Sequence, residues 1–182
     1  IHGVDDAELR HGDTLNDPLH KENDTTLQTF DYIVANPPFS TKGWMKSAKA
    51  NDTFMRWGAS DNLAQVPPPG CGDYAFLLHI IASLKTQGHA ACILPHGVLF
   101  RGGAEAEIRK FLVKKHWISG IIGLPGNLFY GTGIPACIII IDKEHAASSK
   151  GIFMIDAKEG FQKDGAKNRL REQDVKLIVD TW

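Results

Sequence analysis

The feature that most constrains the fold is an apolar run closed by two prolines, Phe30–Ala35 followed by Asn36-Pro37-Pro38-Phe39. A run of about six β-favouring residues bounded by turn formers predicts a buried strand. The prolines end that strand, because neither can donate a ladder hydrogen bond and each fixes φ at about −65°. Asn36 is held extended by the proline that follows it. It is therefore expected at the carboxyl edge of the sheet, where open α/β sheets bind ligands.

The segment after this strand offers hydrogen-bond acceptors and an aromatic face. The Asn36 amide oxygen and the proline carbonyls can accept hydrogen bonds, and the prolines have no N–H groups that would compete. Phe39 supplies a ring against which a planar group can stack. This set suits a planar substrate that carries an NH₂ group. The alternative is that the four residues only terminate the strand.

Alternating strand-like and helix-like runs predict the fold class. Strands are expected at 7–10, 30–35, 89–94, 117–124 and 134–142, with an edge strand at 152–156. Helices are expected at 73–88, where Asp73 is the predicted cap, and at 103–116 and 172–182. Strands separated by helical crossovers predict a largely parallel, doubly wound α/β sheet. The short link at 127–133 predicts that the last two long strands pair in antiparallel fashion.

Three further segments carry weaker signals. Residues 40–72 have no clear periodicity but contain Trp44 and Trp57, and a loop of that length is usually functional or disordered. Residues 157–171 are predicted to be a loop, and their interspersed basic and acidic side chains are typical of a solvated surface, with contact to the DNA backbone as the alternative. Arg101, before two glycines at the start of a helix, fits either a phosphate contact or a plain helix start.

Composition excludes several classes of protein. A chain of 182 residues favours one domain, with a core at about 7–156 and, at 157–182, a polar segment plus a terminal helix. The net charge of −1 gives no general attraction to polyanions. The three cysteines lack metal-type spacing, so no metal site is predicted and a reducing, cytoplasmic location fits best. No apolar run reaches the ~18 residues of a membrane span, so no membrane association is expected.

The Asn-Pro-Pro-Phe segment resembles the (D/N/S)PP(Y/F/W) signature of amino-methyltransferases, which methylate exocyclic amines of DNA bases or a protein glutamine amide. The motifs around it are similar to those of the modification subunit of type I restriction-modification systems. They are, in chain order, Gly12–Leu15, Asp73–His79, Leu94–Gly103 and Gly123–Ile134. The match runs from about residue 8 to 156 and is far more specific than the tetrapeptide alone.

This resemblance implies the Rossmann-like fold of S-adenosylmethionine-dependent methyltransferases, here the C-terminal part of the sheet with its antiparallel last strand pair. The glycine-rich turn by which these enzymes approach the cofactor does not precede Asp13. The family carries that turn upstream of the matched region, so the chain looks like the second half of a catalytic domain. We therefore expect the 182-residue chain by itself to bind S-adenosylmethionine weakly or not at all, and to lack methyltransferase activity.

The resemblance also implies roles for single residues. The catalytic segment is Asn36, Pro37, Pro38 and Phe39, in which the Asn36 amide and the Pro37 carbonyl accept the amine hydrogens and Phe39 stacks on the base. Asp13 matches the acidic residue that accepts a hydrogen bond from the adenine amine of S-adenosylmethionine. Its Gly-Asp-Thr context is also ordinary turn chemistry, so both interpretations stay open.

A second aromatic contact to the base is implied at Phe129 or Tyr130, and the sequence leaves open which ring makes it and whether both only pack. The expected function is methyl transfer from S-adenosylmethionine to the N6 amine of adenine in double-stranded DNA. The expected partners are the DNA-specificity subunit and the restriction subunit of a type I complex. Two alternatives remain: a protein-glutamine N5-methyltransferase, and a non-catalytic scaffold that binds a specificity subunit. The Trp-containing loop and residues 128–134 favour DNA as the substrate.

Overall fold

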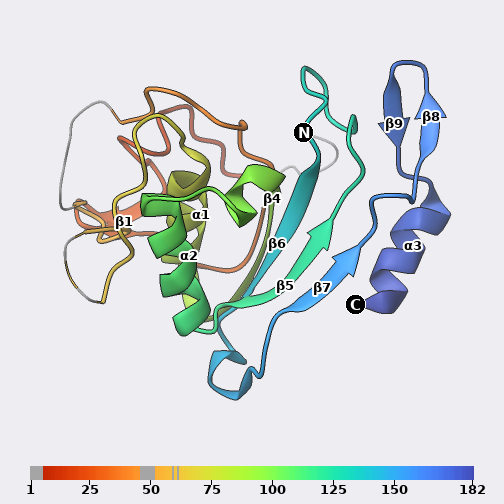
Figure 1. Ribbon diagram of the computed structural model, residues 1–182. Coiled ribbons are helices and arrows are strands. Elements are labelled where there is room, and N and C mark those ends of the chain that lie inside the picture. The colour runs from red at the N-terminus through yellow and green to blue at the C-terminus, as the bar shows by residue number, and fades with distance from the viewer. Residues whose placement is uncertain (1–5, 46–51, 59, 61) are drawn as a thin grey trace.

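A five-stranded sheet organises the protein (Figure 1). The computed structural model describes residues 6–45, 52–58, 60 and 62–182. In spatial order the strands are β3 (Phe30–Ala35), β4 (Leu84–Pro95), β6 (Ala136–Asp142), β5 (Ile118–Gly123) and β7 (Phe153–Asp156). Two separate two-stranded sheets are formed by β1 (Lys21–Asn23) with β2 (Thr26–Leu27) and by β8 (Gln162–Asp164) with β9 (Lys167–Arg169).

The strand directions confirm the expected antiparallel pair. β5 and β6 are antiparallel, with Ile121 opposite Ile139, and β7 is an edge strand parallel to β5. β3 is parallel to β4, as expected for strands joined through a helix. Because β6 is antiparallel to both of its neighbours, the sheet is mixed rather than largely parallel.

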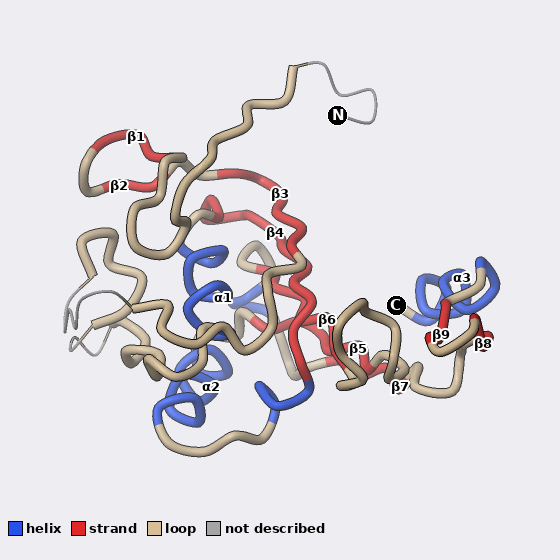
Figure 2. The backbone as a smooth tube through the Cα atoms, turned by 90° about the horizontal axis from the view of Figure 1, so that it is seen from above, coloured by secondary structure: helices blue, strands red, loops and turns tan. Residues whose placement is uncertain are grey.

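Helices lie on both sides of the sheet (Figure 2). α1 (Asp73–Ala82) and α2 (Ala104–Lys114) share one side, and α3 (Glu172–Thr181) lies on the other, next to the β8–β9 ribbon. Two short 3₁₀ helices, η1 (His96–Leu99) and η2 (Ala146–Ser148), follow β4 and β6.

The core lies between the sheet and the pair α1 and α2. Cys92 of β4 and Ile139 of β6 are paired in the ladder and buried together, and Leu112 of α2 is fully buried in the same cluster. Alternate residues of these strands point to the opposite face, where Ile93 and Ile138 line an apolar cavity of about 570 Å³ beneath α3. Alternate residues of the central strands therefore face the helical core on one side of the sheet and the apolar cavity on the other.

Two predictions about the first strands were wrong. Residues 7–10 form no strand, because no described strand lies beside them to complete a ladder of hydrogen bonds. The outer edge of β3 also has no partner strand among the described residues. β3 was predicted to be buried, but it is the edge strand, with Tyr32 and Val34 77% and 84% exposed. Its apolar side chains therefore alternate between a half-buried face and an open one.

Two other elements differ from the prediction. α1 ends at Ala82 rather than Gly88, because β4 already begins at Leu84. Residues 157–171 contain the β8–β9 ribbon instead of only a loop.

In the 40–72 segment, Trp44 and Trp57 are 5% and 4% exposed and pack edge to face, with ring centroids 5.4 Å apart. These tryptophans belong to the core, so they do not support the choice of DNA as the substrate.

In the part of the chain that the structure describes, no helix has the length and apolar character needed to cross a membrane.

Candidate functional site

The two segments that the sequence predicted to act together line one cavity at the carboxyl end of β3. It has a volume of about 340 Å³ and is lined by Asn36, Pro37, Pro38, Phe39, Phe129, Tyr130, Gly131 and Thr132. The second half of this lining belongs to the link between β5 and β6. Because those strands are antiparallel, their link returns over the same edge of the sheet at which β3 ends.

Two acceptors of this cavity are available to a ligand. Asn36 is exposed and Pro37 half-buried. Among the described residues, none donates a hydrogen bond to the Asn36 side-chain oxygen or to the Pro37 carbonyl. The Pro38 carbonyl differs, because it accepts a hydrogen bond from Thr41 Oγ1 at 3.1 Å. The cavity therefore offers one amide oxygen and one carbonyl oxygen from adjacent residues.

The aromatic side chains approach the cavity from both segments. The rings of Phe39 and Phe129 are in edge-to-face contact, with centroids 5.5 Å apart, and both residues are half-buried. Tyr130 is 95% exposed. Phe129 is thus already packed against Phe39, whereas nearly the whole surface of Tyr130 is available for contact with a ligand.

A buried carboxylate holds the turn that follows Phe39. Asp73 is fully buried, and its Oδ1 accepts a hydrogen bond from the Ser40 backbone N–H at 2.6 Å. Ser40 has a φ of 51°, a left-handed conformation that is unfavourable for a non-glycine residue. The Asp73 contact stabilises this turn. Asp73 was predicted to cap α1, but Gly72 occupies the cap position and the Asp73 side chain points to the Ser40 turn instead.

Arg101 neutralises that buried charge. Its Nη2 donates to Asp73 Oδ2 at 2.7 Å, and its Nη1 donates to Glu105 Oε1 at 2.9 Å. Burial would lower the pKa of Arg101, but its bonds to Asp73 and Glu105 raise it above its ordinary value. The Arg101 guanidinium therefore binds these two carboxylates. Of the two roles considered for Arg101, this favours a structural role at the start of the helix over contact with a phosphate group.

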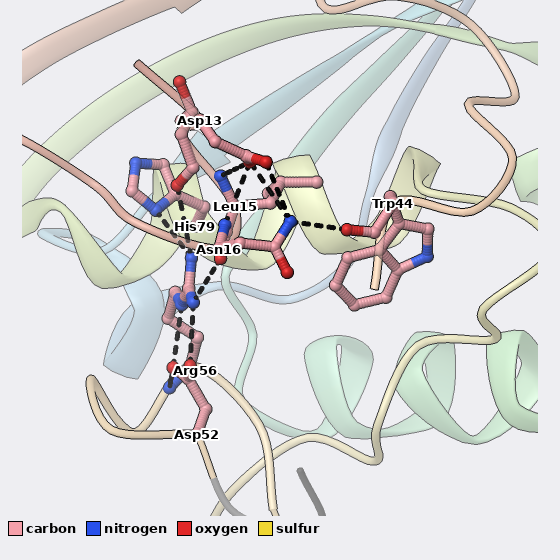
Figure 3. A network of polar contacts seen from close by, with 8 residues as sticks. Asp13, Leu15, Asn16, Trp44, Asp52, Arg56 and His79 are labelled. Atoms are coloured by element: carbon pink, nitrogen blue, oxygen red, sulfur yellow. Dashed lines mark hydrogen bonds and ion pairs between the residues drawn. The ribbon is translucent and has the colours of Figure 1, made fainter. Parts of the chain in front are cut away.

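Asp13 does not line the cavity and sits in a turn of its own (Figure 3). Its Oδ1 accepts hydrogen bonds from the backbone N–H groups of Leu15 and Asn16, at 3.2 and 3.0 Å. Asn16 Nδ2 bonds the Asp13 carboxylate and also donates to the Trp44 carbonyl at 2.6 Å. The turn chemistry considered from the sequence is present, and it fixes the orientation of a half-exposed carboxylate.

A buried ion pair supports the Asp13 turn from below (Figure 3). The side chains of Arg56 and Asp52 are 2% and 8% exposed, and Arg56 Nη2 lies 2.7 Å from Asp52 Oδ1. The same Nη2 donates to the Leu15 carbonyl at 2.8 Å, and Nη1 lies 3.2 Å from His79 Nδ1. Burial would raise the pKa of Asp52, but the hydrogen bonds and charge of Arg56 lower it overall.

His79 is held neutral by its surroundings. Burial, and then the nearby positive charge of Arg56, lower its pKa to about 4. The neutral imidazole can accept the Arg56 hydrogen bond at Nδ1, whereas an imidazolium cannot. The network therefore requires an unprotonated His79.

The sequence did not reveal which residues hold the site in place. Asp73 and Arg101 lie in motifs that the sequence shows, but their pairing with each other and with the Ser40 turn appears only in the fold, as do the contacts of the Arg56–Asp52 pair with the Asp13 turn. The 40–72 segment contains one signal, an arginine close to two aromatic residues, Phe54 and Trp57, on whose rings a cation can stack. In the described ranges, no group of three or more His, Cys, Asp or Glu side chains is arranged to hold a metal ion.

Comparison with known proteins identifies relatives over nearly the whole chain. A family model described as N-6 DNA methylase matches residues 1–182. The methylase subunit of the type I restriction enzyme MjaIX from Methanocaldococcus jannaschii is 34% identical, over 94% of this chain and 31% of that protein. The corresponding MpnII subunit from Mycoplasma pneumoniae is 33% identical, over 100% of this chain and 34% of that protein.

A solved structure shows the same fold. The crystal structure of the type I restriction-modification system methyltransferase subunit from Streptococcus thermophilus matches with a TM-score of 0.76 and 34% identity, over 92% of this chain and 34% of that one. The methyltransferase fold expected from the sequence is thereby confirmed. This chain spans about a third of the length of these relatives.

We predict that His79 makes stability depend on pH between about 6.5 and 4. Its pKa is lower in the folded protein, so the unfolded chain binds more protons in this window and stability falls as the pH is lowered. The full loss from this group is on the order of 3 kcal/mol. In urea unfolding at a series of pH values, the free energy of unfolding should decline less steeply toward low pH for His79→Gln than for wild type. The contributions of the other titratable groups are common to both proteins and cancel in this comparison. Parallel curves for the two proteins would contradict the assignment.

Proposed function

We propose, because the chain belongs to the N-6 DNA methylase family, that it forms the target-base site of an enzyme that transfers a methyl group from S-adenosylmethionine to the N6 amine of adenine in DNA. One observation carries the proposal. A single cavity gathers the Asn36 amide, the Pro37 carbonyl and the rings of Phe39 and Phe129, which together suit a planar base with an exocyclic amine. The volume of about 340 Å³ falls within the range of small-molecule pockets.

The residues act on the reactivity of the amine. The N6 lone pair of adenine is delocalised into the ring, which makes the nitrogen a poor nucleophile. If Asn36 Oδ1 and the Pro37 carbonyl each accept one amine hydrogen, the nitrogen is drawn toward tetrahedral geometry and its lone pair points out of the ring plane. No general base is needed before methylation, because the proton then leaves a nitrogen that is already cationic. The rate gain comes from positioning and from oriented acceptors.

The methyl donor fits the chemistry of the Asp13 turn. When bound, S-adenosylmethionine supplies a sulfonium-activated methyl group. Asp13 is half-exposed, and backbone donors of its own turn fix its carboxylate, so it is a suitable acceptor for the adenine amine of this cofactor. The Arg56–Asp52 pair keeps the turn in place through the Leu15 carbonyl.

The base has to leave the duplex to reach the cavity. Extrusion costs a few kcal/mol, and stacking on an aromatic ring returns about 1–3 kcal/mol per base. Phe39 is the ring next to the acceptors, and Tyr130, with 95% of its surface exposed, is the ring with most area to offer. We assign Phe39 to stacking and Tyr130 to closing the cavity over the extruded base.

The relatives suggest the setting of this reaction. The M. jannaschii and M. pneumoniae proteins are methylase subunits of type I restriction enzymes, and we infer the same kind of assembly, with a DNA-specificity subunit and a restriction subunit in the cytoplasm. The net charge of −1 supports this assembly, because this chain alone has little general attraction to DNA and other subunits would have to supply it. Within the complete protein it would be one part of the catalytic domain.

We predict that Asn36→Ala in the complete protein lowers kcat for DNA adenine methylation by about 100-fold or more, by analogy with the loss of one oriented transition-state contact. Asn36 is exposed and lines the cavity, so folding and S-adenosylmethionine binding should be nearly unchanged. The measurement is the single-turnover transfer of a radiolabelled methyl group to DNA.

Two variants serve as controls for Asn36→Ala. Asn36→Asp keeps an acceptor oxygen and should retain more activity than the alanine variant. Asn62→Ala removes an exposed amide outside the cavity and should leave the rate unchanged. An Asn36→Ala rate within about threefold of wild type would remove Asn36 from the mechanism. Methyl transfer to a glutamine-bearing peptide but not to DNA would overturn the choice of substrate.

We also predict that Phe39→Ala weakens capture of the base more than binding of S-adenosylmethionine. Its ring borders the acceptors, whereas Asp13 lies in a separate turn. The fluorescence of 2-aminopurine at the target position reports extrusion and should fall in the variant. An undiminished signal would assign Phe39 to packing against Phe129 alone.

A further inference from the structure

The β8–β9 ribbon holds the loop that forms the second wall of the cavity. Lys167 Nζ donates to the Phe129 carbonyl at 2.6 Å and to the Thr132 carbonyl at 3.3 Å. Its neighbour Asn168 donates from its backbone N–H to the Asn127 carbonyl at 2.9 Å. Both residues come from a segment that the sequence predicted to be a loop without regular structure.

The Lys167 contacts fix the width of the loop. The two carbonyls that share its ammonium group flank Tyr130 and Gly131, which are the tip of the wall. Gly131 lies in a turn with a φ of 77°, and the chain reverses there between the antiparallel strands β5 and β6. Bonds from an ammonium group are stronger than those between neutral groups, and this one joins both ends of the reversal.

A second contact anchors the base of the same loop. Asn168 is 7% exposed, and its Nδ2 donates to the Gly126 carbonyl at 2.7 Å. Three backbone carbonyls of the loop and that of Gly126 at its base therefore receive hydrogen bonds from two adjacent residues of β9. Lys163 on the same ribbon shows the contrast, because it is exposed whereas Lys167 is half-buried.

We propose that Lys167 is a positioning residue for the target base. Its bonds to the Phe129 and Thr132 carbonyls set the opening of the cavity and place Phe129 against Phe39. This inference rests on the proposed function, since it concerns how the same cavity admits an extruded adenine. The β8–β9 ribbon is then part of the base site, although about 35 residues separate it from the loop it holds.

The test compares Lys167→Met with Lys163→Met in the complete protein. Both variants remove one positive charge from the same ribbon, but only Lys167 bonds the Phe129–Thr132 loop. We expect Lys167→Met to raise the KM for DNA about tenfold, and to lower the 2-aminopurine extrusion signal, with kcat and S-adenosylmethionine binding much less affected. Lys163→Met should resemble wild type. Lys167→Gln, which keeps an amide donor without the charge, should lie between Lys167→Met and wild type.

The outcomes separate this inference from the proposed function. Equal increases in KM for both methionine variants, which shrink together as salt is raised, would show that the lysines only attract the DNA backbone and would overturn the positioning role. If Lys167→Met fails to fold, Lys167→Gln decides, and a wild-type KM and extrusion signal in it would overturn the role as well. An absence of DNA methylation by the wild-type protein would instead contradict the proposed function itself.

Discussion

The buried carboxylate of Asp73 is the contact on which the rest of the site depends. A charge with no exposure to water is strongly unfavourable unless it is paired and hydrogen-bonded, and Asp73 meets both conditions through Arg101 and the Ser40 N–H. The arrangement joins the start of α1, the turn after Phe39 and the approach to α2. Removing either partner would leave a buried charge without compensation, so the Asn36–Phe39 segment and the helical core are stabilised together.

The direction of one strand brings the two walls of the cavity together. β6 is inserted antiparallel between β4 and β5, so the β5–β6 link emerges at the edge where β3 ends. A parallel strand in that place would need a connection that crosses to the opposite edge of the sheet, instead of the short link that keeps Phe129 and Tyr130 beside Asn36. The antiparallel pair is therefore a requirement of the base site as well as a feature of the fold, and Lys167 fixes the loop that it presents.

Local pattern was sufficient for some of this structure. The antiparallel pair, the edge strand at 152–156 and the terminal helix each follow from apolar periodicity or from the length of a link, and the structure confirms them. The strand end placed Asn36–Phe39 at the edge of the sheet, but the association of Phe129 and Tyr130 with the same site came from the family resemblance, and the two segments do line one cavity. The assignment of Asp13 to the cofactor remains a proposal.

The rest depends on contacts between distant residues, which local pattern does not contain. Residues 7–10 look like a strand but have no partner in the described chain, and β3 looks buried but lies at the edge. Trp44 and Trp57 do lie in a loop, but the local pattern does not show that they pack on each other in the core, next to the buried Arg56–Asp52 pair. Lys167 appeared as one basic residue in a polar segment, and only the ribbon places it under the loop.

The most direct test of the account is a structure of the complete protein bound to target DNA and a non-reactive analogue of S-adenosylmethionine. We predict an adenine extruded into this cavity, with its N6 within hydrogen-bond distance of both Asn36 Oδ1 and the Pro37 carbonyl and its ring stacked on Phe39. An adenine that is still stacked in the duplex, or one whose N6 is bound by residues outside Asn36–Phe39, would contradict the account.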